Sequence, residues 1–494
     1  MNVVAEATTP SSIRIALHDG VELSADHYSA NKGAPGPAVV MFTPYLKGDM
    51  IPVILPIAAL NAAGIDVLTV DIRGTGQSDG VFPGPLSPLE VSDGAEVIEW
   101  VADQTWCNGR VGLAGGSYPG GIQLLIAARH PRGLACIAPA VAPIDFYRDW
   151  THRGGIPTHS NWASATFLQT PQPERSITPA LEYYYGTAQA LEEDGQPFWE
   201  RSPITVLDKI GVPILFIGGL YDYFARGTLR GFDAAKAPKR LVFGPWGHQY
   251  PEDPTEVIDW FRYWLCDEGA NPVGEENVVF WRIGADVWHR STGRVLPFAP
   301  TVVDLGSSRL PVRATQNGWP QNVTPSPLPI FMDTGTPSGM HLWGEDLVLS
   351  LGQVTGDIQG APILRFSLAG DDCSDADLFA RLSIKYSDGR LEQLTEGRVR
   401  LSHRAIDPEK SRRYPDGTYE SVHLTHVAAQ PLPQAATEVL IEMLPTSLRL
   451  DGGSTLQLGL SARRVDGISR AAALDIAELE VLLPVLDGIG SEAR

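Results

Sequence analysis

The first 250 residues alternate between short apolar runs and segments whose composition suits helices. Each run has the length and uniform apolar character of a strand buried on both faces. The runs cover residues 37–43, 64–71, 110–116, 135–141, 213–218 and 240–243. The helical segments between them include 51–63, 87–104 and 122–129. Strands that alternate with helices predict a parallel, doubly wound α/β sheet, preceded by a β-ribbon at residues 12–28.

Two regions depart from this rhythm. Residues 144–205 are rich in aromatic side chains and show no strand pattern, which predicts a helical cap inserted over the carboxyl edge of the sheet. After residue 270 the chain shows short alternating segments from residue 278 to 483, which predict a β-sandwich with a long connection at 300–345. We therefore expect an α/β domain (1–143 and 206–270), a cap (144–205) and an all-β domain (271–494).

Composition and charge narrow the classes of function. The formal net charge of −20 disfavours nucleic acid or an anionic membrane as partner, because phosphate binding requires clustered Lys and Arg. The four cysteines are scattered without a C-x-x-C pair, so free thiols are expected rather than a disulfide or zinc framework. Neither a secretory signal nor an apolar run of about 18 residues is present, which favours a cytoplasmic location. A homo-oligomer is compatible with the sequence.

One short stretch carries the first candidate chemistry. The strand at 110–116 ends in glycines, Ser117 follows, and a helical segment begins directly after it. This arrangement is typical of a nucleophile elbow, in which a serine hydroxyl stands on a tight turn between strand and helix. The usual pattern is G-x-S-x-G, whereas Pro119 occupies the second position after the serine here. A glycine-rich turn that holds an ordinary serine is the alternative.

The chain supplies partners for Ser117 in the order that the chemistry requires. A serine nucleophile needs a histidine base, and that base needs a carboxylate to orient it. Asp222 follows the strand at 213–218, and His248 follows the strand at 240–243. Asp222 could instead cap the helix that begins near Phe224. The rival acid Asp208 precedes its strand and so falls at the opposite edge of the sheet.

A tetrahedral intermediate also needs donors for its oxyanion. The backbone N–H of Tyr118, next to the serine, is one candidate. The second candidate is the hydroxyl of Tyr45, in the loop after the strand that ends at Thr43, although a lone tyrosine could equally be packing.

No metal or organic cofactor is expected. His423 and His426 have a spacing that resembles a metal pair, but an odd separation puts them on opposite faces of a strand. The acidic turn at Asp375 and Asp377 could bind a cation, but acidic turns before strands are common.

Several motifs together resemble the X-prolyl dipeptidyl-peptidase-like acyl esterases, the CocE/NonD hydrolases. Residues 115–120 resemble the G-x-S-Y-x-G elbow of that family, in which the shifted glycine is the rule. Residues 71–80 are similar to its D-x-R-G-x-G-x-S-x-G turn, and residues 106–112 to its W-C-x-G-x-V-G segment. The pairs at 44–45 and 221–222 and the G-P-W-G-H run at 244–248 also match. The resemblance spans the whole chain.

The resemblance implies an α/β-hydrolase fold with an inserted helical cap and a C-terminal jelly roll. It implies Ser117 as nucleophile, with Asp222 and His248 as its partners, and Tyr45 with the Tyr118 N–H as oxyanion hole. It further implies an acyl pocket of aromatic side chains, for which the matching positions are Trp150, Trp162 and Phe224. Trp162 could equally be a core residue.

The leading hypothesis is a serine hydrolase that cleaves small-molecule carboxylic esters through an acyl-enzyme. An amide- or peptide-directed enzyme, such as an X-Pro dipeptidyl-peptidase, a β-lactam acylase or an acyltransferase, would use the same residues. A non-catalytic binding protein that uses the jelly roll is the alternative from another class. Asp145 and Asp149, at the entrance to the cap, are candidates to hold a substrate ammonium or simply to cap a helix.

Overall fold

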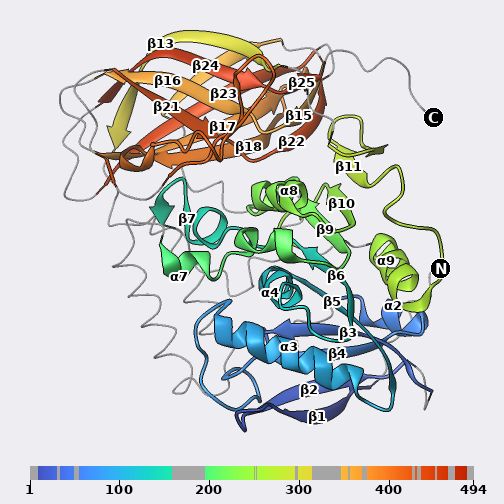
Figure 1. The fold of residues 1–494 in the computed structure, drawn as a ribbon. Helices are drawn as coiled ribbons and strands as arrows, with labels where there is room; N and C mark the ends of the chain where they lie inside the picture. Colours follow the sequence, from blue (N-terminus) through green and yellow to red (C-terminus); the bar gives the residue numbers. More distant parts are fainter. Residues whose placement is uncertain are drawn as a thin grey trace.

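The computed structural model shows an all-β lobe stacked on an α/β body (Figure 1). The residues that it describes are 9–30, 34–48, 55–157, 195–249, 251, 253–294, 297, 299–313, 346–353, 356–369, 375–425, 429–430, 436–450, 453–465 and 473–486. Among the helices of these ranges, none has the length and apolar character needed to cross a membrane.

The α/β body is built on a ten-stranded sheet with the spatial order β1-β2-β4-β3-β5-β6-β9-β10-β11-β12. Its first two strands, β1 (Ser11–Ala16) and β2 (Glu22–Tyr28), form the predicted antiparallel ribbon. The parallel strands are β3 (Gly36–Thr43), β4 (Asp66–Asp71), β5 (Cys107–Gly116), β6 (Leu134–Ala140), β9 (Ile214–Gly219) and β10 (Lys239–Gly244). Every residue of β3, β4 and β9 is buried, as continuous apolar strands require. The predicted α/β fold is confirmed.

Helices cover both faces of this sheet (Figure 1). They are α2 (Ile57–Ala62), α3 (Pro88–Ala102), α4 (Tyr118–Ala127), α8 (Ala225–Ala234) and α9 (Thr255–Cys266). Helix α3 begins where the sequence places its start, because Ser87 caps it by accepting a hydrogen bond from the Glu90 N–H. Helices α3 and α4 pack together, and α9 packs beneath β5 and β6.

The expected boundary of the all-β domain at residue 271 is wrong. Strand β11 (Val278–Arg282) pairs in parallel with β10, and β12 (Val287–Ser291) pairs with β11 in antiparallel fashion. Both strands therefore complete the α/β sheet. Alternation along β11 predicts a strand but does not say which sheet the strand joins, because that choice is made by tertiary pairing.

The C-terminal domain is the predicted sandwich. Its main sheet has the order β18-β17-β23-β13-β24-β16-β21, with β14 paired to β23. The strands are β13 (Thr301–Arg313), β14 (Leu347–Gly352), β15 (Gly356–Gly360), β16 (Ile363–Ala369), β17 (Ala376–Lys385), β18 (Leu391–Arg400), β19 (Arg412–Arg413), β20 (Tyr419–Ser421), β21 (Thr437–Glu442), β22 (Thr446–Leu450), β23 (Thr455–Arg464), β24 (Ala473–Leu483) and β25 (Val485–Leu486). A single 3-10 turn, Leu401–His403, follows β18 in the described residues.

Strand β13 corrects the expectation that residues 300–345 form only a connection. It pairs with β24 over most of its length, with register shifts around Gly306. Most of its side chains are exposed, and it contains both Gly306 and Pro311. Its sequence therefore lacks the alternation of apolar and polar residues that predicts a strand. Residues 314–345 lie outside the described residues.

The cap is described only at its two ends, and residues 158–194 lie outside the described residues. The first end holds a π-helix, η1 (Phe146–Thr151), followed by β7 (His152–Arg153) and β8 (Ile156–Pro157). The second end holds α7 (Gln196–Trp199) and two 3-10 turns, Pro203–Thr205 and Leu207–Lys209.

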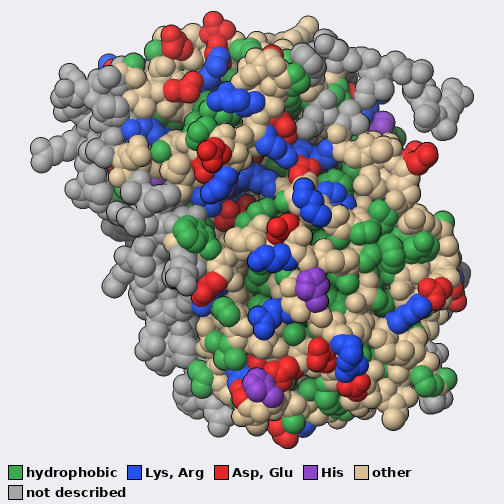
Figure 2. All heavy atoms as spheres, viewed as in Figure 1, with side chains coloured by type: hydrophobic (Ala, Val, Ile, Leu, Met, Phe, Trp, Pro, Cys, Tyr) green, Lys and Arg blue, Asp and Glu red, His purple; other side chains and the backbone are tan. Residues whose placement is uncertain are grey.

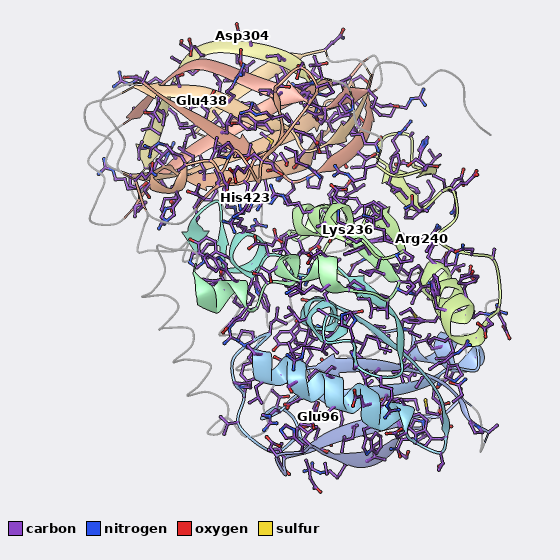
Figure 3. The ribbon with its side chains drawn as sticks, in the orientation of Figure 1. Glu96, Lys236, Arg240, Asp304, His423 and Glu438 are labelled. Carbon is purple, nitrogen blue, oxygen red and sulfur yellow. The ribbon has the colours of Figure 1, made fainter. Side chains whose placement is uncertain are left out.

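The sandwich rests on the carboxyl edge of the α/β sheet through polar contacts. The Arg400 N–H donates to the Gly154 carbonyl at 2.7 Å, and Arg153 pairs with Glu396 at 2.8 Å. Figure 2 shows basic and acidic side chains gathered at this junction. In Figure 3, His423 points from the sandwich toward the junction, whereas Asp304 lies at the far end of the same domain. Charged pairs therefore join the two domains directly over the edge where the candidate residues lie.

Candidate active site

The carboxyl ends of three strands in one half of the sheet bring the predicted catalytic residues together. Ser117 follows β5, Asp222 follows β9 and His248 follows β10. The His248 Nε2 lies 2.8 Å from the Ser117 Oγ, and the His248 Nδ1 lies 2.8 Å from Asp222 Oδ1. All three side chains are buried. This chain of hydrogen bonds is the geometry of a serine nucleophile with its base and orienting acid.

The turn that carries Ser117 is strained in the manner of a nucleophile elbow. Ser117 has φ +64° and ψ −124°, which side-chain-bearing residues rarely adopt. A Cβ on Gly115 would lie 2.5 Å from the Pro119 Cβ, and one on Gly120 would lie 2.8 Å from the Ala140 carbonyl oxygen. Glycine is thus needed three residues after the serine, where α4 crosses β6. Pro119 is tolerated because the first turn of a helix needs no N–H donor there.

The loops after β9 and β10 hold the base and the acid in contact. A Cβ on Gly219 would lie 2.2 Å from the Trp246 carbonyl oxygen, so the close approach of these loops depends on that glycine. The Tyr223 ring stacks on the His248 ring, with centroids 4.3 Å apart and planes 25° apart. The buried Asp222 Oδ2 accepts no hydrogen bond from the described residues. Asp222 therefore orients the His248 ring through its Oδ1.

The two predicted oxyanion donors converge beside Ser117. The Tyr45 hydroxyl donates to Ser117 Oγ at 3.2 Å and accepts from the Tyr118 N–H at 3.4 Å. Burial raises the pKa of the Tyr45 hydroxyl, which keeps it protonated as a donor. Both donors are thus positioned before any substrate arrives, and such preorganisation is what oxyanion stabilisation requires.

Asp71 holds the Tyr45 loop, a role that the sequence motif did not reveal. Its carboxylate accepts the Lys47 N–H at 2.8 Å and the Gln77 N–H at 2.9 Å. A Cβ on Gly76 would lie 2.1 Å from Asp71 Oδ2, which explains the glycine at that position of the turn. The motif at residues 71–80 thus connects two loops and fixes the backbone beside Tyr45.

Glu90 is a second residue that the sequence reasoning missed. It is completely buried on α3, and its Oε2 accepts the Tyr118 hydroxyl at 2.7 Å. Its other oxygen, Oε1, is buried and has no hydrogen-bond partner among the described residues. Burial raises the pKa of Glu90 to about 8, against the lowering effects of the Tyr118 hydroxyl and Arg201. Tyr118, whose N–H is a candidate oxyanion donor, is thus bonded to a Glu90 carboxyl group that is protonated at pH 7.

We expect Glu90 to make the stability of the protein fall as pH rises. In the folded protein the pKa of this carboxyl is about 8, above its ordinary value of 4.5. Its contribution to the free energy of unfolding is therefore complete below about pH 4.5 and is lost by about pH 8. The slope is at most about 1.4 kcal/mol per pH unit. Melting temperatures measured across this window should fall more for the wild type than for Glu90→Gln. Parallel curves for the two proteins would show that Glu90 has an ordinary pKa.

Two of the aromatic side chains that the family resemblance implies pack against the residues beside Ser117. Trp150 is half-buried, with its ring centroid 5.9 Å from that of Tyr118 and 6.2 Å from that of Phe224. The Phe224 ring lies edge-on to His248 at 5.3 Å. The structure thus brings Trp150 and Phe224 to the site, and Trp162 lies outside the described residues.

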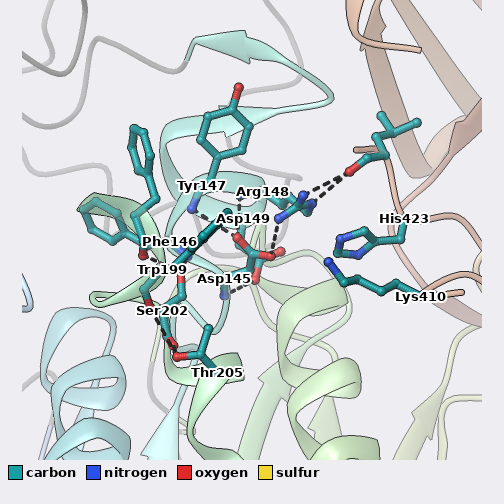
Figure 4. Close-up of polar contacts among 12 residues, drawn as sticks. Asp145, Phe146, Tyr147, Arg148, Asp149, Trp199, Ser202, Thr205, Lys410 and His423 are labelled. Atoms are coloured by element: carbon teal, nitrogen blue, oxygen red, sulfur yellow. Dashed lines mark hydrogen bonds and ion pairs between the residues drawn. The ribbon is translucent and has the colours of Figure 1, made fainter. Parts of the chain in front are cut away.

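Polar contacts anchor the π-helix that carries Trp150 (Figure 4). Asp145 caps this helix by accepting the N–H groups of Tyr147 and Arg148, and it pairs with the Arg148 guanidinium at 3.1 Å. Arg148 also donates to the Leu424 carbonyl of the sandwich at 3.0 Å. Asp149 accepts the Asp145 N–H at 2.9 Å. Both carboxylates therefore serve the helix, which agrees with the capping alternative.

The remaining candidates are engaged elsewhere. Burial, with Arg148 and Arg230 nearby, lowers the pKa of His423 to about 3, and His426 lies outside the described residues. Asp375 accepts hydrogen bonds from the Ser402 N–H and hydroxyl. Within the described ranges, no group of three His, Cys, Asp or Glu side chains could hold a metal ion. The described cysteines, Cys107, Cys136 and Cys266, are free thiols.

Comparisons with known proteins find related hydrolases. Residues 19–250 match the model of the X-Pro dipeptidyl-peptidase (S15) family, and residues 355–474 match the X-Pro dipeptidyl-peptidase C-terminal non-catalytic domain. Cocaine esterase from Rhodococcus sp. (strain MB1 Bresler) is 26% identical in an alignment 488 residues long. The alignment covers 80% of this chain and 83% of that protein.

Two solved structures show the same fold over almost the whole chain. A CocE/NonD family hydrolase from Staphylococcus aureus aligns with a TM-score of 0.78 at 18% identity, and the alignment covers 98% of each chain. An α-amino acid ester hydrolase aligns with a TM-score of 0.69 at 16% identity, again over 98% of each chain. The chain is thus a serine ester hydrolase, in which residues 19–250 match the S15 family and residues 355–474 match the C-terminal non-catalytic domain of X-Pro dipeptidyl-peptidases.

Proposed function

We propose that Ser117, His248 and Asp222 hydrolyse carboxylic esters, with Tyr45 and the Tyr118 N–H as the oxyanion hole. The observation that carries this proposal is the unbroken chain of 2.8 Å contacts from Asp222 through His248 to Ser117. The Tyr45 hydroxyl contacts the same Oγ, and the Tyr118 N–H contacts that hydroxyl.

The reaction proceeds in two halves. His248 Nε2 takes the proton of Ser117 as Oγ attacks the ester carbonyl, and the resulting oxyanion accepts hydrogen bonds from Tyr45 and the Tyr118 N–H. Collapse of this intermediate breaks the C–O bond, and His248 returns its proton to the departing alcohol. Water then attacks the acyl-enzyme with the same base, which releases the acid and restores Ser117.

Esters, rather than peptides with a free amino terminus, are the substrates that the described residues favour. An ammonium needs a carboxylate at the acyl pocket, but Asp145 and Asp149 are engaged with the π-helix and with arginines. The side chains that pack against Tyr118 and His248, Trp150 and Phe224, are aromatic. An apolar acyl group fits such surroundings.

A fluorophosphonate probe and a panel of acyl donors test this proposal. We expect the probe to modify one serine, with the adduct mapped to the peptide that contains Ser117. Turnover of p-nitrophenyl esters should exceed that of α-amino acid esters and of X-Pro anilides. An adduct on another serine would contradict the site, and faster cleavage of X-Pro anilides would assign the chain to the peptidases.

A further inference from the structure

A recess between the two domains has no part in ester hydrolysis. It lies between α8 and the sandwich and has an empty volume of about 350 Å³, including the part open to solvent. Four arginines line it: Arg226 and Arg230 on α8, Arg294 after β12, and Arg412 on β19. Two carboxylates, Glu420 and Glu442, also line it. The charged band at the waist of Figure 2 belongs to this junction.

Part of this positive charge is already matched by protein carboxylates. Glu442 pairs with Arg230 at 3.0 Å, Glu420 pairs with Arg412 at 2.8 Å, and Asp233 pairs with both Arg294 and Arg412. Arg226 is different. Its nearest carboxylate oxygens, on Asp149 and Glu442, lie at 3.7 and 3.9 Å, which is too far for hydrogen bonds. Within the described residues this guanidinium has no hydrogen-bond acceptor, although little of it is exposed.

Three other donors in the recess also lack a protein acceptor among the described residues. The Tyr414 hydroxyl and the Ser421 hydroxyl line the recess, belong to residues that are each only 6% exposed, and make no side-chain hydrogen bond. The Arg412 Nε is buried and has no partner in the part of the chain that the structure describes. Burial raises the pKa of Tyr414, so its hydroxyl remains a donor. Of these donors, the Arg412 Nε is closed to solvent, and a buried donor normally has an acceptor. The other donors face the recess, where an acceptor group could reach all of them.

We propose that this recess binds a small tetrahedral oxyanion, a phosphate or a phosphate monoester, through Arg226, Arg412, Tyr414 and Ser421. A phosphate offers several acceptor oxygens around one centre, and arginine is the side chain best suited to it. The net positive lining favours an anion, whereas the carboxylates Glu420 and Glu442 are held by Arg412 and Arg230.

The position of the recess gives such binding a consequence. Arg226 lies in the first turn of α8, four residues after Asp222, and β19 belongs to the sandwich. An oxyanion bound here would join the helix that follows the catalytic acid to the C-terminal domain. We therefore expect it to stabilise the junction of the two domains, because a ligand that binds the folded state alone raises the melting temperature.

Thermal melting in rising inorganic phosphate tests the proposal, with sodium chloride holding the ionic strength constant. We expect a saturable rise of about 1–3 °C. Phenyl phosphate and acetate are titrated in the same way, and acetate should give no saturable rise in melting temperature. A larger shift with phenyl phosphate would identify a phosphate monoester as the better ligand. A shift that does not saturate, or that chloride alone reproduces, would overturn the proposal.

Substitutions in the recess test whether phosphate binds at these residues. Arg226→Gln and Tyr414→Phe should each weaken the apparent phosphate affinity by about tenfold or more, because each removes a donor to a charged ligand. Arg309→Gln, which changes an exposed arginine elsewhere in the sandwich, should behave as the wild type. Ser117→Ala should keep the full shift, which separates this recess from the catalytic serine. An unchanged phosphate response in both Arg226→Gln and Tyr414→Phe would contradict the assignment.

Discussion

Replacing Ser117 with alanine is expected to lower kcat/KM for p-nitrophenyl esters by a factor on the order of 10⁴ to 10⁶. The change removes the hydroxyl oxygen that lies 2.8 Å from His248 Nε2. His248 then has no nucleophile to activate, and no acyl-enzyme can form. The donors at Tyr45 and Tyr118 remain, so some turnover above the uncatalysed rate should persist.

The comparison for this variant is Ser367→Ala. Ser367 lies on β16 of the sandwich, where its hydroxyl donates to Glu478, so the same chemical deletion is made far from the site. Initial rates should be measured on both proteins after their melting curves show intact folding. A wild-type rate in Ser117→Ala would mean that another residue is the nucleophile. Equal losses in both variants would point to general damage.

The catalytic residues were predictable because a simple rule of topology fixes them. Parallel strands place their carboxyl ends at one edge of the sheet, so residues that follow β5, β9 and β10, with only β6 between them, lie close together. Ser117, Asp222 and His248 each follow such a strand in chain order, and local sequence shows this without any long-range information. The motif around Pro119 then indicated which family of hydrolases the sequence resembles.

Other features were hidden because their causes are not local. Asp71 acts on the backbone N–H of Lys47, and Glu90 acts on the Tyr118 hydroxyl. Neither of these contacts can be predicted from the spacing or periodicity of residues along the chain. Strand β11 was assigned to the wrong domain because its pattern fits either sheet, and β13 was missed because one exposed strand has no apolar alternation. Sequence patterns thus predicted the elements well and the pairings between them poorly.

Replacing Tyr45 with phenylalanine is expected to lower kcat by about 10²- to 10³-fold with a much smaller change in KM. The substitution keeps the ring, which packs edge-on to Tyr118 at 6.3 Å, and removes the hydroxyl that donates to Ser117. That hydroxyl meets negative charge only once the carbonyl carbon becomes tetrahedral, so its loss weakens the transition state more than substrate binding.

The size of this loss follows from what the variant retains. The Tyr118 N–H belongs to the backbone and stays in place, so one oxyanion donor survives beside an intact Ser117 and His248. The effect should therefore be smaller than that of Ser117→Ala, and it should appear in both acylation and deacylation, because both pass through an oxyanion. Tyr28→Phe, on strand β2, is the matched control. A fall in melting temperature with kcat preserved would make Tyr45 a packing residue, as its buried ring alone would allow.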